Sequence, residues 1–95
     1  MSVETVGRVR FPLGRTVITR GALDALTQED VFAGMNRHAN GDWGDLCGED
    51  KQANDDALNV GTRLLSAYHT GAGQKFWIIT EADRSITTVL LPKEY

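Results

Sequence analysis

The sequence has little cysteine and no long apolar run. Its single cysteine, Cys47, cannot form a disulfide within the chain, which favours a reducing compartment. No apolar stretch approaches the roughly 20 residues that span a bilayer, so no membrane segment is expected. The first residues lack a basic segment followed by an apolar one, and no signal peptide is predicted. These absences together predict a cytoplasmic protein.

The length of the chain limits what it can hold. With 95 residues, 41% of them hydrophobic and 24% charged, the composition is typical of one soluble globular domain. A chain of this size buries about 60–65% of its unfolded surface. We therefore expect one modest core and little room for a deep substrate cavity.

Periodicity predicts an α+β fold in the order β-α-α-α-β-β-β. An antiparallel meander of three to four strands is expected to carry about three helices on one face. The predicted strands are residues 15–19, 63–69, 75–80 and 86–91, and the predicted helices are residues 21–26, 27–39 and 49–59. Residues 1–10 are expected to form an extended arm, and residues 11–95 a single domain.

The second predicted helix shows the clearest apolar face. Thr27 is a suitable N-cap, and the acidic residues that follow it suit the positive end of the helix dipole. Val31, Phe32, Met35 and Ala39 recur at helical spacing, which assigns all four to the side that faces the core.

The stretch 40–50 is the most distinctive part of the chain. Trp43 lies between two Gly-Asp steps, and glycine and aspartate both favour turns. Trp43 either caps the core or forms an exposed anchor, and the cap is the favoured interpretation. Residues 42–56 hold six carboxylates and one cation, which predicts an acidic surface that repels phosphate and suits a basic partner.

Catalytic chemistry has few candidates in this sequence. His38 lies near the core face and the end of its helix, where a histidine can interact with the negative end of the dipole. Cys47 precedes a helix start, and a cysteine with a histidine partner could act as a nucleophile. Asp42 and Asp45 complete this candidate group, but no pair has the spacing of a known metal loop. We expect no catalytic residue, no metal and no cofactor.

The turn at residues 81–85 combines Glu81, Asp83 and Arg84. An ion pair of Arg84 with either carboxylate would hold the loop in place. A hairpin tip supplies no cleft for paired-carboxylate chemistry, so the alternatives are a structural turn or a contact surface.

Several longer motifs suggest a family. They are Gly41-Asp42-Trp43-Gly44-Asp45-Leu46, Glu49-Asp50-Lys51-Gln52-Ala53-Asn54-Asp55, Leu64-Leu65-Ser66-Ala67-Tyr68, Thr80-Glu81-Ala82-Asp83-Arg84-Ser85, Thr87-Thr88 and Leu91-Pro92-Lys93-Glu94-Tyr95. From residue 11 to the C-terminus the chain resembles a family of short proteins carried on bacterial plasmids, phages and integrated elements. Some of its members are labelled as related to type I restriction. The resemblance implies an association with such systems and transfers no catalytic residue.

Three functions remain open from the sequence. The leading one is a non-enzymatic mobile-element protein that binds another protein, with a host defence complex (restriction or CRISPR) as the expected target of inhibition. The alternatives are a small enzyme or ligand-binding domain centred on His38, Asp42, Asp45 and Cys47, and a nucleic-acid binder that uses the N-terminal arginines. A nucleic-acid partner is not expected, and a homodimer stays open. The predicted partner-binding residues are Asp42, Trp43, Asp45, Asp55, Asp56, Glu81, Asp83 and Arg84.

Overall fold

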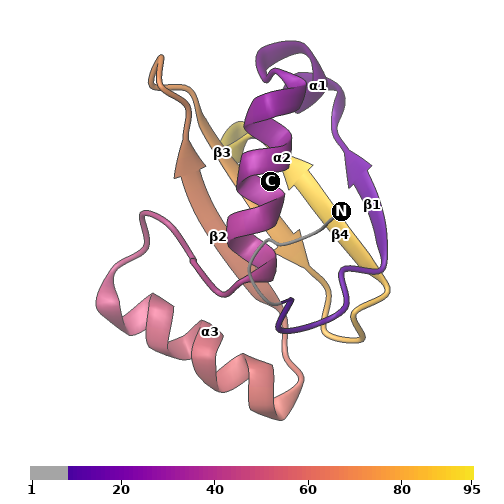
Figure 1. Ribbon diagram of the computed structural model, residues 1–95, viewed down its shortest axis with the longest axis vertical. Helices are drawn as coiled ribbons and strands as arrows, with labels where there is room; N and C mark the ends of the chain where they lie inside the picture. The colour runs from indigo at the N-terminus through magenta and orange to yellow at the C-terminus, as the bar shows by residue number, and fades with distance from the viewer. Residues whose placement is uncertain (1–8) are drawn as a thin grey trace, which may run out of the picture.

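The helices and strands follow one another in the predicted order. The computed structural model describes residues 9–95, so the predicted arm of residues 1–10 lies almost entirely outside the described residues. The elements are β1 (Arg15–Ile18), α1 (Arg20–Ala25), α2 (Gln28–Ala39), α3 (Gly48–Val60), β2 (Leu64–His69), β3 (Lys75–Thr80), β4 (Ile86–Leu90) and the short 3-10 helix η1 (Pro92–Glu94) (Figure 1). The α+β fold class is confirmed.

The four strands form one sheet in the order β1-β4-β3-β2. β2, β3 and β4 make the predicted antiparallel meander. β1 joins it beside β4, as expected for the strand around Val17, but it runs parallel to β4. The prediction of a purely antiparallel sheet is therefore wrong, and the sheet is mixed. Three helices separate β1 from the meander, so no tight turn forces β1 to run antiparallel to its neighbour.

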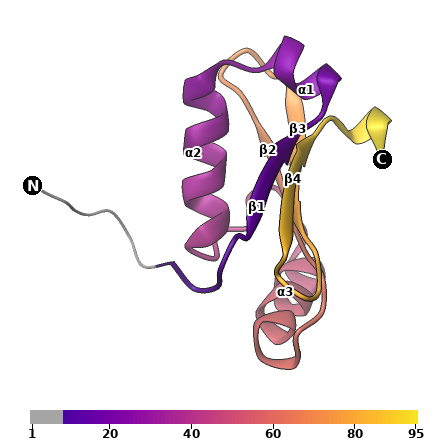
Figure 2. The same cartoon turned by 90° about the vertical axis from the view of Figure 1, so that its right-hand side faces the viewer.

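The helices occupy different places around this sheet. Figure 2 shows α2 lying along one face, with α1 at one end of the sheet and α3 beyond the other end. α3 packs against β2, where the Asn54 side chain donates to the carbonyl of Leu65 (2.7 Å) and accepts from its amide (3.2 Å). Among residues 9–95, no helix is both long enough and apolar enough to cross a membrane.

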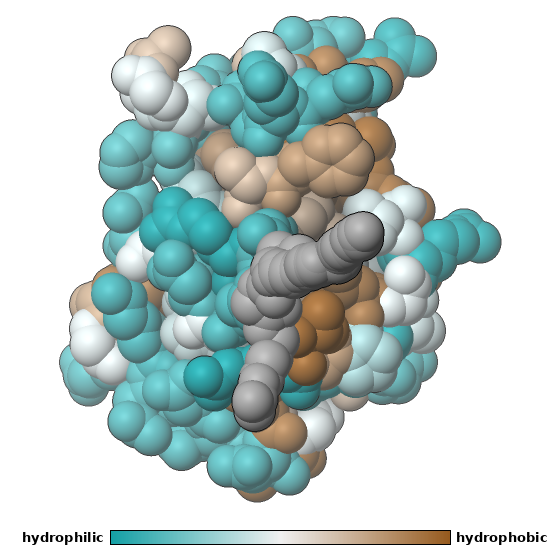
Figure 3. All heavy atoms as spheres, in the orientation of Figure 1, coloured by the Kyte–Doolittle hydropathy of each residue, from teal (hydrophilic) through white to brown (hydrophobic). Residues whose placement is uncertain are grey.

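α2 begins as the sequence predicts, but one of its apolar residues faces outward. Thr27 forms a capping box with Asp30, and each side chain accepts from the other's backbone amide. The buried residues of the helix include Gly34 and His38. The assignment of Phe32 to the core face is wrong, because this side chain is 74% exposed. Apolar residues gather between α2 and β1 on the face shown in Figure 3.

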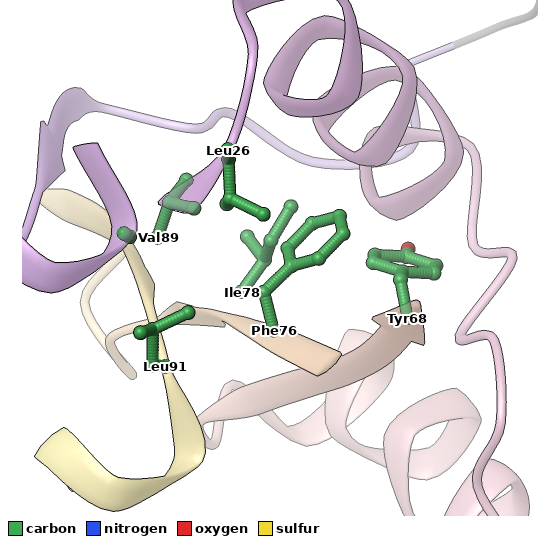
Figure 4. Packing of buried hydrophobic residues seen from close by; sticks show 7 residues of the cluster. Leu26, Tyr68, Phe76, Ile78, Val89 and Leu91 are labelled. Carbon is green, nitrogen blue, oxygen red and sulfur yellow. The ribbon is translucent and has the colours of Figure 1, made fainter. Parts of the chain in front are cut away.

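The interior divides into two apolar clusters. The larger cluster lies between α1, α2 and the sheet, and Figure 4 shows Leu26, Phe76 and Ile78 directed toward one another. The smaller cluster contains Phe11, Trp43, Ala57 and Leu64, and it joins the segment before β1 to the loop before α3. Gly34 allows α2 to approach the sheet closely, because a Cβ there would lie 2.8 Å from the Phe76 ring.

Candidate functional site

A chain of buried polar side chains runs between the two apolar clusters. His38 Nδ1 lies 2.5 Å from the Ser66 hydroxyl, and His38 Nε2 lies 2.9 Å from the Thr80 hydroxyl. The Thr80 hydroxyl lies 2.7 Å from that of Thr87, which donates to the Leu13 carbonyl at 2.6 Å. The four side chains of this hydrogen-bond network are fully buried. Each of them has a hydrogen-bond partner, as buried polar groups require.

The Leu13 carbonyl, at the end of this series of hydrogen bonds, determines which group donates in each of them. The Leu13 carbonyl can only accept, so the Thr87 hydroxyl uses its proton there. Thr80 then donates to Thr87, and His38 Nε2–H donates to Thr80. His38 Nδ1 is left without a proton and accepts from Ser66. The network therefore defines one neutral tautomer of the imidazole.

The surroundings of His38 favour this neutral form. Burial lowers the pKa of His38 to about 4, and the positive charge of Arg84 contributes to the decrease. Phe11 and Trp43 lie edge-on to the imidazole, with ring centroids 5.2 and 5.7 Å away. The expected interaction with the negative end of α2 is wrong, because a neutral histidine that bonds two strand hydroxyls does not act as a cationic helix cap. His38 is a structural residue that ties α2 to β2 and β3.

Trp43 caps the core, which is the interpretation that the sequence favoured. It is 3% exposed, and its indole N–H donates to Asp55 at 3.0 Å. Gly44 follows it with a φ of +78°, and a Cβ there would lie 2.0 Å from the Ala67 carbonyl oxygen. Glycine is needed at this position for both reasons. The loop thus pairs with β2 through the bridge between Gly44 and Ala67.

The other catalytic candidates have separate partners. Asp42 forms an ion pair with Arg37 at 2.7 Å, and the hydrogen bond from Arg37 lowers the pKa of Asp42. Asp45 lies 2.6 Å from His69. Cys47 is exposed at the N-cap of α3, and its side chain caps no amide. Within residues 9–95, no three His, Cys, Asp or Glu side chains gather into a metal site. The structure does not bring the proposed catalytic group together.

The acidic surface predicted for residues 42–56 lies along the loop and the outer side of α3. Of the thirteen residues of α3, only Asn54 and Ala57 are buried. Asp56 accepts from Gln52 one turn earlier, while Asp55 is committed to the indole of Trp43. Glu49 and Asp50 occupy the first turn, where negative charge suits the helix dipole.

The hairpin at residues 81–85 has a structural role. The guanidinium of Arg84 donates to the carbonyls of Thr62, Glu81 and Ala57, and it lies over the Phe11 ring. The ion pair expected within this turn is replaced by these carbonyl contacts. Asp83 accepts from the amide and hydroxyl of Ser85, and the hydroxyl contact is the main cause of its lowered pKa.

Two features of the structure were not predicted from the sequence. The first is the Ser66, Thr80 and Thr87 hydroxyl chain, for which no spacing rule exists because its members come from three strands. The second is an apolar groove between α2 and β1 that includes Phe32 and Val9. The sequence did contain a signal for the groove. Val31 and Phe32 are adjacent, and adjacent side chains on a helix point about 100° apart, so the two cannot both face the core.

Comparison with known proteins finds no match: no family model, curated protein or solved structure is significantly similar to this chain.

Proposed function

We propose that this protein is a non-enzymatic accessory protein that acts by binding another protein, with the outer side of α3 as one contact surface. The exposure of α3 is the observation that carries the proposal. Only two of its residues are buried, while Glu49, Asp50 and Asp56 face solvent. A concentration of negative charge on an exposed helix favours encounter with a basic protein surface.

The partner-binding residues proposed from the sequence divide into two groups on this basis. Asp42, Asp45, Asp55, Asp56, Glu81 and Asp83 have exposed side chains, and they remain candidates for contact. Trp43 is inside the core and Arg84 is committed to three backbone carbonyls, so both support the surface from within.

The enzyme alternative has weaker support. Its central base, His38, is fully buried and uses both ring nitrogens in hydrogen bonds to hydroxyls. A general base must reach the proton that it removes. The nucleic-acid alternative depends on arginines near the start of the chain, and the net charge of −3 opposes it.

The resemblance to mobile-element proteins directs the choice of partner. We propose a host defence complex, restriction or CRISPR, as the target of inhibition. The test is transformation by an unmodified plasmid into a host that carries a type I restriction complex, with and without this protein. A CRISPR-targeted plasmid serves in the same way. Rescue of transformation in the defended host, and no change in an undefended host, would support inhibition. Unchanged transformation in both defence systems would overturn it.

Charge reversal tests the contact surface separately from the target. The variant Asp50→Lys with Asp56→Lys changes two exposed carboxylates of α3, and Asp55 is left intact because it bonds Trp43. The matched control, Asp24→Lys with Glu29→Lys, has the same net charge but changes α1 and α2. The α3 variant should bind the captured partner more weakly, with a larger loss at low salt than at high salt. Equal behaviour of both variants would remove α3 from the interface.

A further inference from the structure

β1 is an edge strand, and among the described residues no strand pairs with its outer side. The amides of Arg15 and Thr19 donate to the carbonyls of Ser85 and Val89, on the β4 side. The backbone N–H and C=O groups of successive residues in a strand point alternately to its two sides, so every second residue pairs with a given neighbour. The peptide groups of Thr16 and Ile18 therefore point away from the sheet. Within residues 9–95, no backbone group of another segment pairs with them.

The opposite edge of the same sheet is closed. On β2, the Asn54 side chain bonds both peptide groups of Leu65. The Ala67 amide donates to the Trp43 carbonyl at 3.1 Å, and the Ala67 carbonyl accepts from Asp45 at 2.7 Å. Exposed strand edges invite pairing with another chain, and proteins commonly cover them. Within residues 9–95, the protein covers the β2 edge and leaves the β1 edge uncovered.

An apolar groove lies beside the open edge, between α2 and β1. It consists of two hollows on either side of the exposed Phe32 ring, with volumes of about 490 and 270 Å³. Leu13 and Met35 line the first hollow, and Ile18 and Val31 line the second. Ile18 belongs to the face of the sheet that α2 covers, because it is paired with the core residue Val89. Figure 3 shows the apolar surface of this region.

The dimensions of the groove suit an added strand. α2 has twelve residues, which corresponds to about 18 Å at 1.5 Å per residue. A strand of five or six residues covers about the same length. Its alternate side chains would enter the groove, while the others would continue the opposite face of the sheet. Backbone pairing combined with pockets for alternate side chains is an established way to bind an extended peptide.

The charges around β1 specify the ends of such a strand. Arg15 and Arg20 are exposed at its two ends, and neither forms an ion pair within the described residues. The one carboxylate that the structure places at these ends, that of Glu94, already accepts from the Thr19 hydroxyl and the Gly21 amide. A second copy paired through β1 would bring the arginines of both copies to one edge, which like-charge repulsion opposes. A segment with carboxylates at its ends would complement them.

We propose that β1 and the α2–β1 groove bind an extended segment of a partner protein by strand addition, and that this segment has apolar residues at alternate positions and acidic residues at its ends. The inference rests on the proposed protein-binding function and adds a second surface to it. The two surfaces lie at opposite edges of the sheet. Failure of strand binding would leave the result of the α3 charge reversal unaffected.

The test uses a designed peptide, Asp-Ile-Thr-Val-Thr-Ile-Glu with blocked ends, and amide hydrogen exchange of the full chain. Without peptide, the amides of Thr16 and Ile18 should exchange freely, while that of Thr19 is protected by its bond to Val89. Saturating peptide should slow the exchange of Thr16 and Ile18 by at least about tenfold. The control peptide, Lys-Ile-Thr-Val-Thr-Ile-Lys, should bind at least about tenfold more weakly at low salt.

Two variants separate pairing from folding. Thr16→Pro removes an amide that faces outward, so β1 should still pair with β4 while peptide binding is lost. The matched variant Val17→Pro removes an amide on the β4 side and should destabilise the fold. Phe32→Ser changes an exposed ring and should weaken peptide binding at least about fivefold without loss of the fold.

Several results would overturn the proposal. One is peptide binding that survives Thr16→Pro in a folded protein, and another is no protection of Thr16 and Ile18 by peptide. Protection that is present without peptide and rises with protein concentration would assign the edge to a second copy. Protection that disappears in a variant starting at Val9 would assign it to residues 1–8 of the same chain. Preferential protection by a DNA duplex would assign the arginines to nucleic acid.

Discussion

Replacing His38 by glutamine should change how the stability of the protein depends on pH. His38 has a pKa of about 4 in the folded protein and a reference value of 6.5. Between these two values the unfolded chain binds more protons than the folded chain. The free energy of unfolding therefore rises with pH across this window. The stabilisation is fully present above about pH 6.5 and is lost as the pH falls toward 4.

The magnitude follows from the two pKa values. Their difference, at 1.36 kcal/mol per pKa unit, corresponds to about 3 kcal/mol in total. About 2 kcal/mol of this decrease should occur between pH 7 and pH 5. The interval stops at pH 5 because Asp42 and Asp83 have lowered pKa values, and their stabilising contacts are lost under more acidic conditions.

Urea unfolding at a series of pH values measures this dependence. His38→Gln removes the titrating group. Between pH 7 and 5, the decrease in the free energy of unfolding should therefore be about 2 kcal/mol smaller for this variant than for the wild type. Its stability at pH 7 should also fall by about 1–3 kcal/mol, because the hydroxyls of Ser66 and Thr80 lose a partner. His69→Gln is the control for the exposed histidine, which lies beside Asp45. Equal pH dependence in wild type and His38→Gln would refute the buried neutral imidazole.

Two further predictions concern the loop that follows α2. Trp43→Ala should lower the free energy of unfolding by about 3–5 kcal/mol, because the side chain is 3% exposed, whereas Trp43→Phe should lower it less. Chemical denaturation measures both variants, and a well-folded Trp43→Ala with wild-type stability would contradict the role of Trp43 as a cap of the core. Gly44→Ala should destabilise by at least about 1–3 kcal/mol, since it combines a positive φ with a clash at Ala67, while Gly48→Ala is the control because its Cβ meets no atom within 4 Å.

The strands and helices were predictable because their signals are local. The β-branched run at Val17 and Ile18 predicts β1, and the Thr27 cap with the acidic turn predicts the start of α2. The direction of β1 was not predictable in the same way. It depends on which strand β1 pairs with after three intervening helices, and the four residues of β1 contain no pattern that specifies this partner or the direction of pairing.

The candidate site was less accessible to sequence reasoning because its contacts are long-range. His38 and Thr80 are 42 residues apart, and Ser66 and Thr87 look like ordinary strand residues. The sequence predicted an ion pair that would let Arg84 hold its turn, but its partners are the carbonyls of residues 57 and 62 as well as one of its own loop. Backbone carbonyls carry no sequence signal, so spacing alone favoured a local ion pair.

The two edges of the sheet suggest why α3 is both acidic and weakly buried. The structural contacts of this helix come mainly from Asn54, which closes the β2 edge, Asp55, which bonds Trp43, and Ala57, which packs in the smaller apolar cluster. The remaining outer positions are free of packing constraints, so they can hold charge without loss of the fold. β1 has no such cover within residues 9–95, and the exposed Arg15 and Arg20 lie at its two ends, with the Glu94 carboxylate bound to the Thr19 hydroxyl. Within the described residues, the β2 edge thus has paired backbone groups beside an acidic helix, and the β1 edge has unpaired backbone groups between the exposed Arg15 and Arg20. This division favours two distinct contact surfaces over one continuous interface.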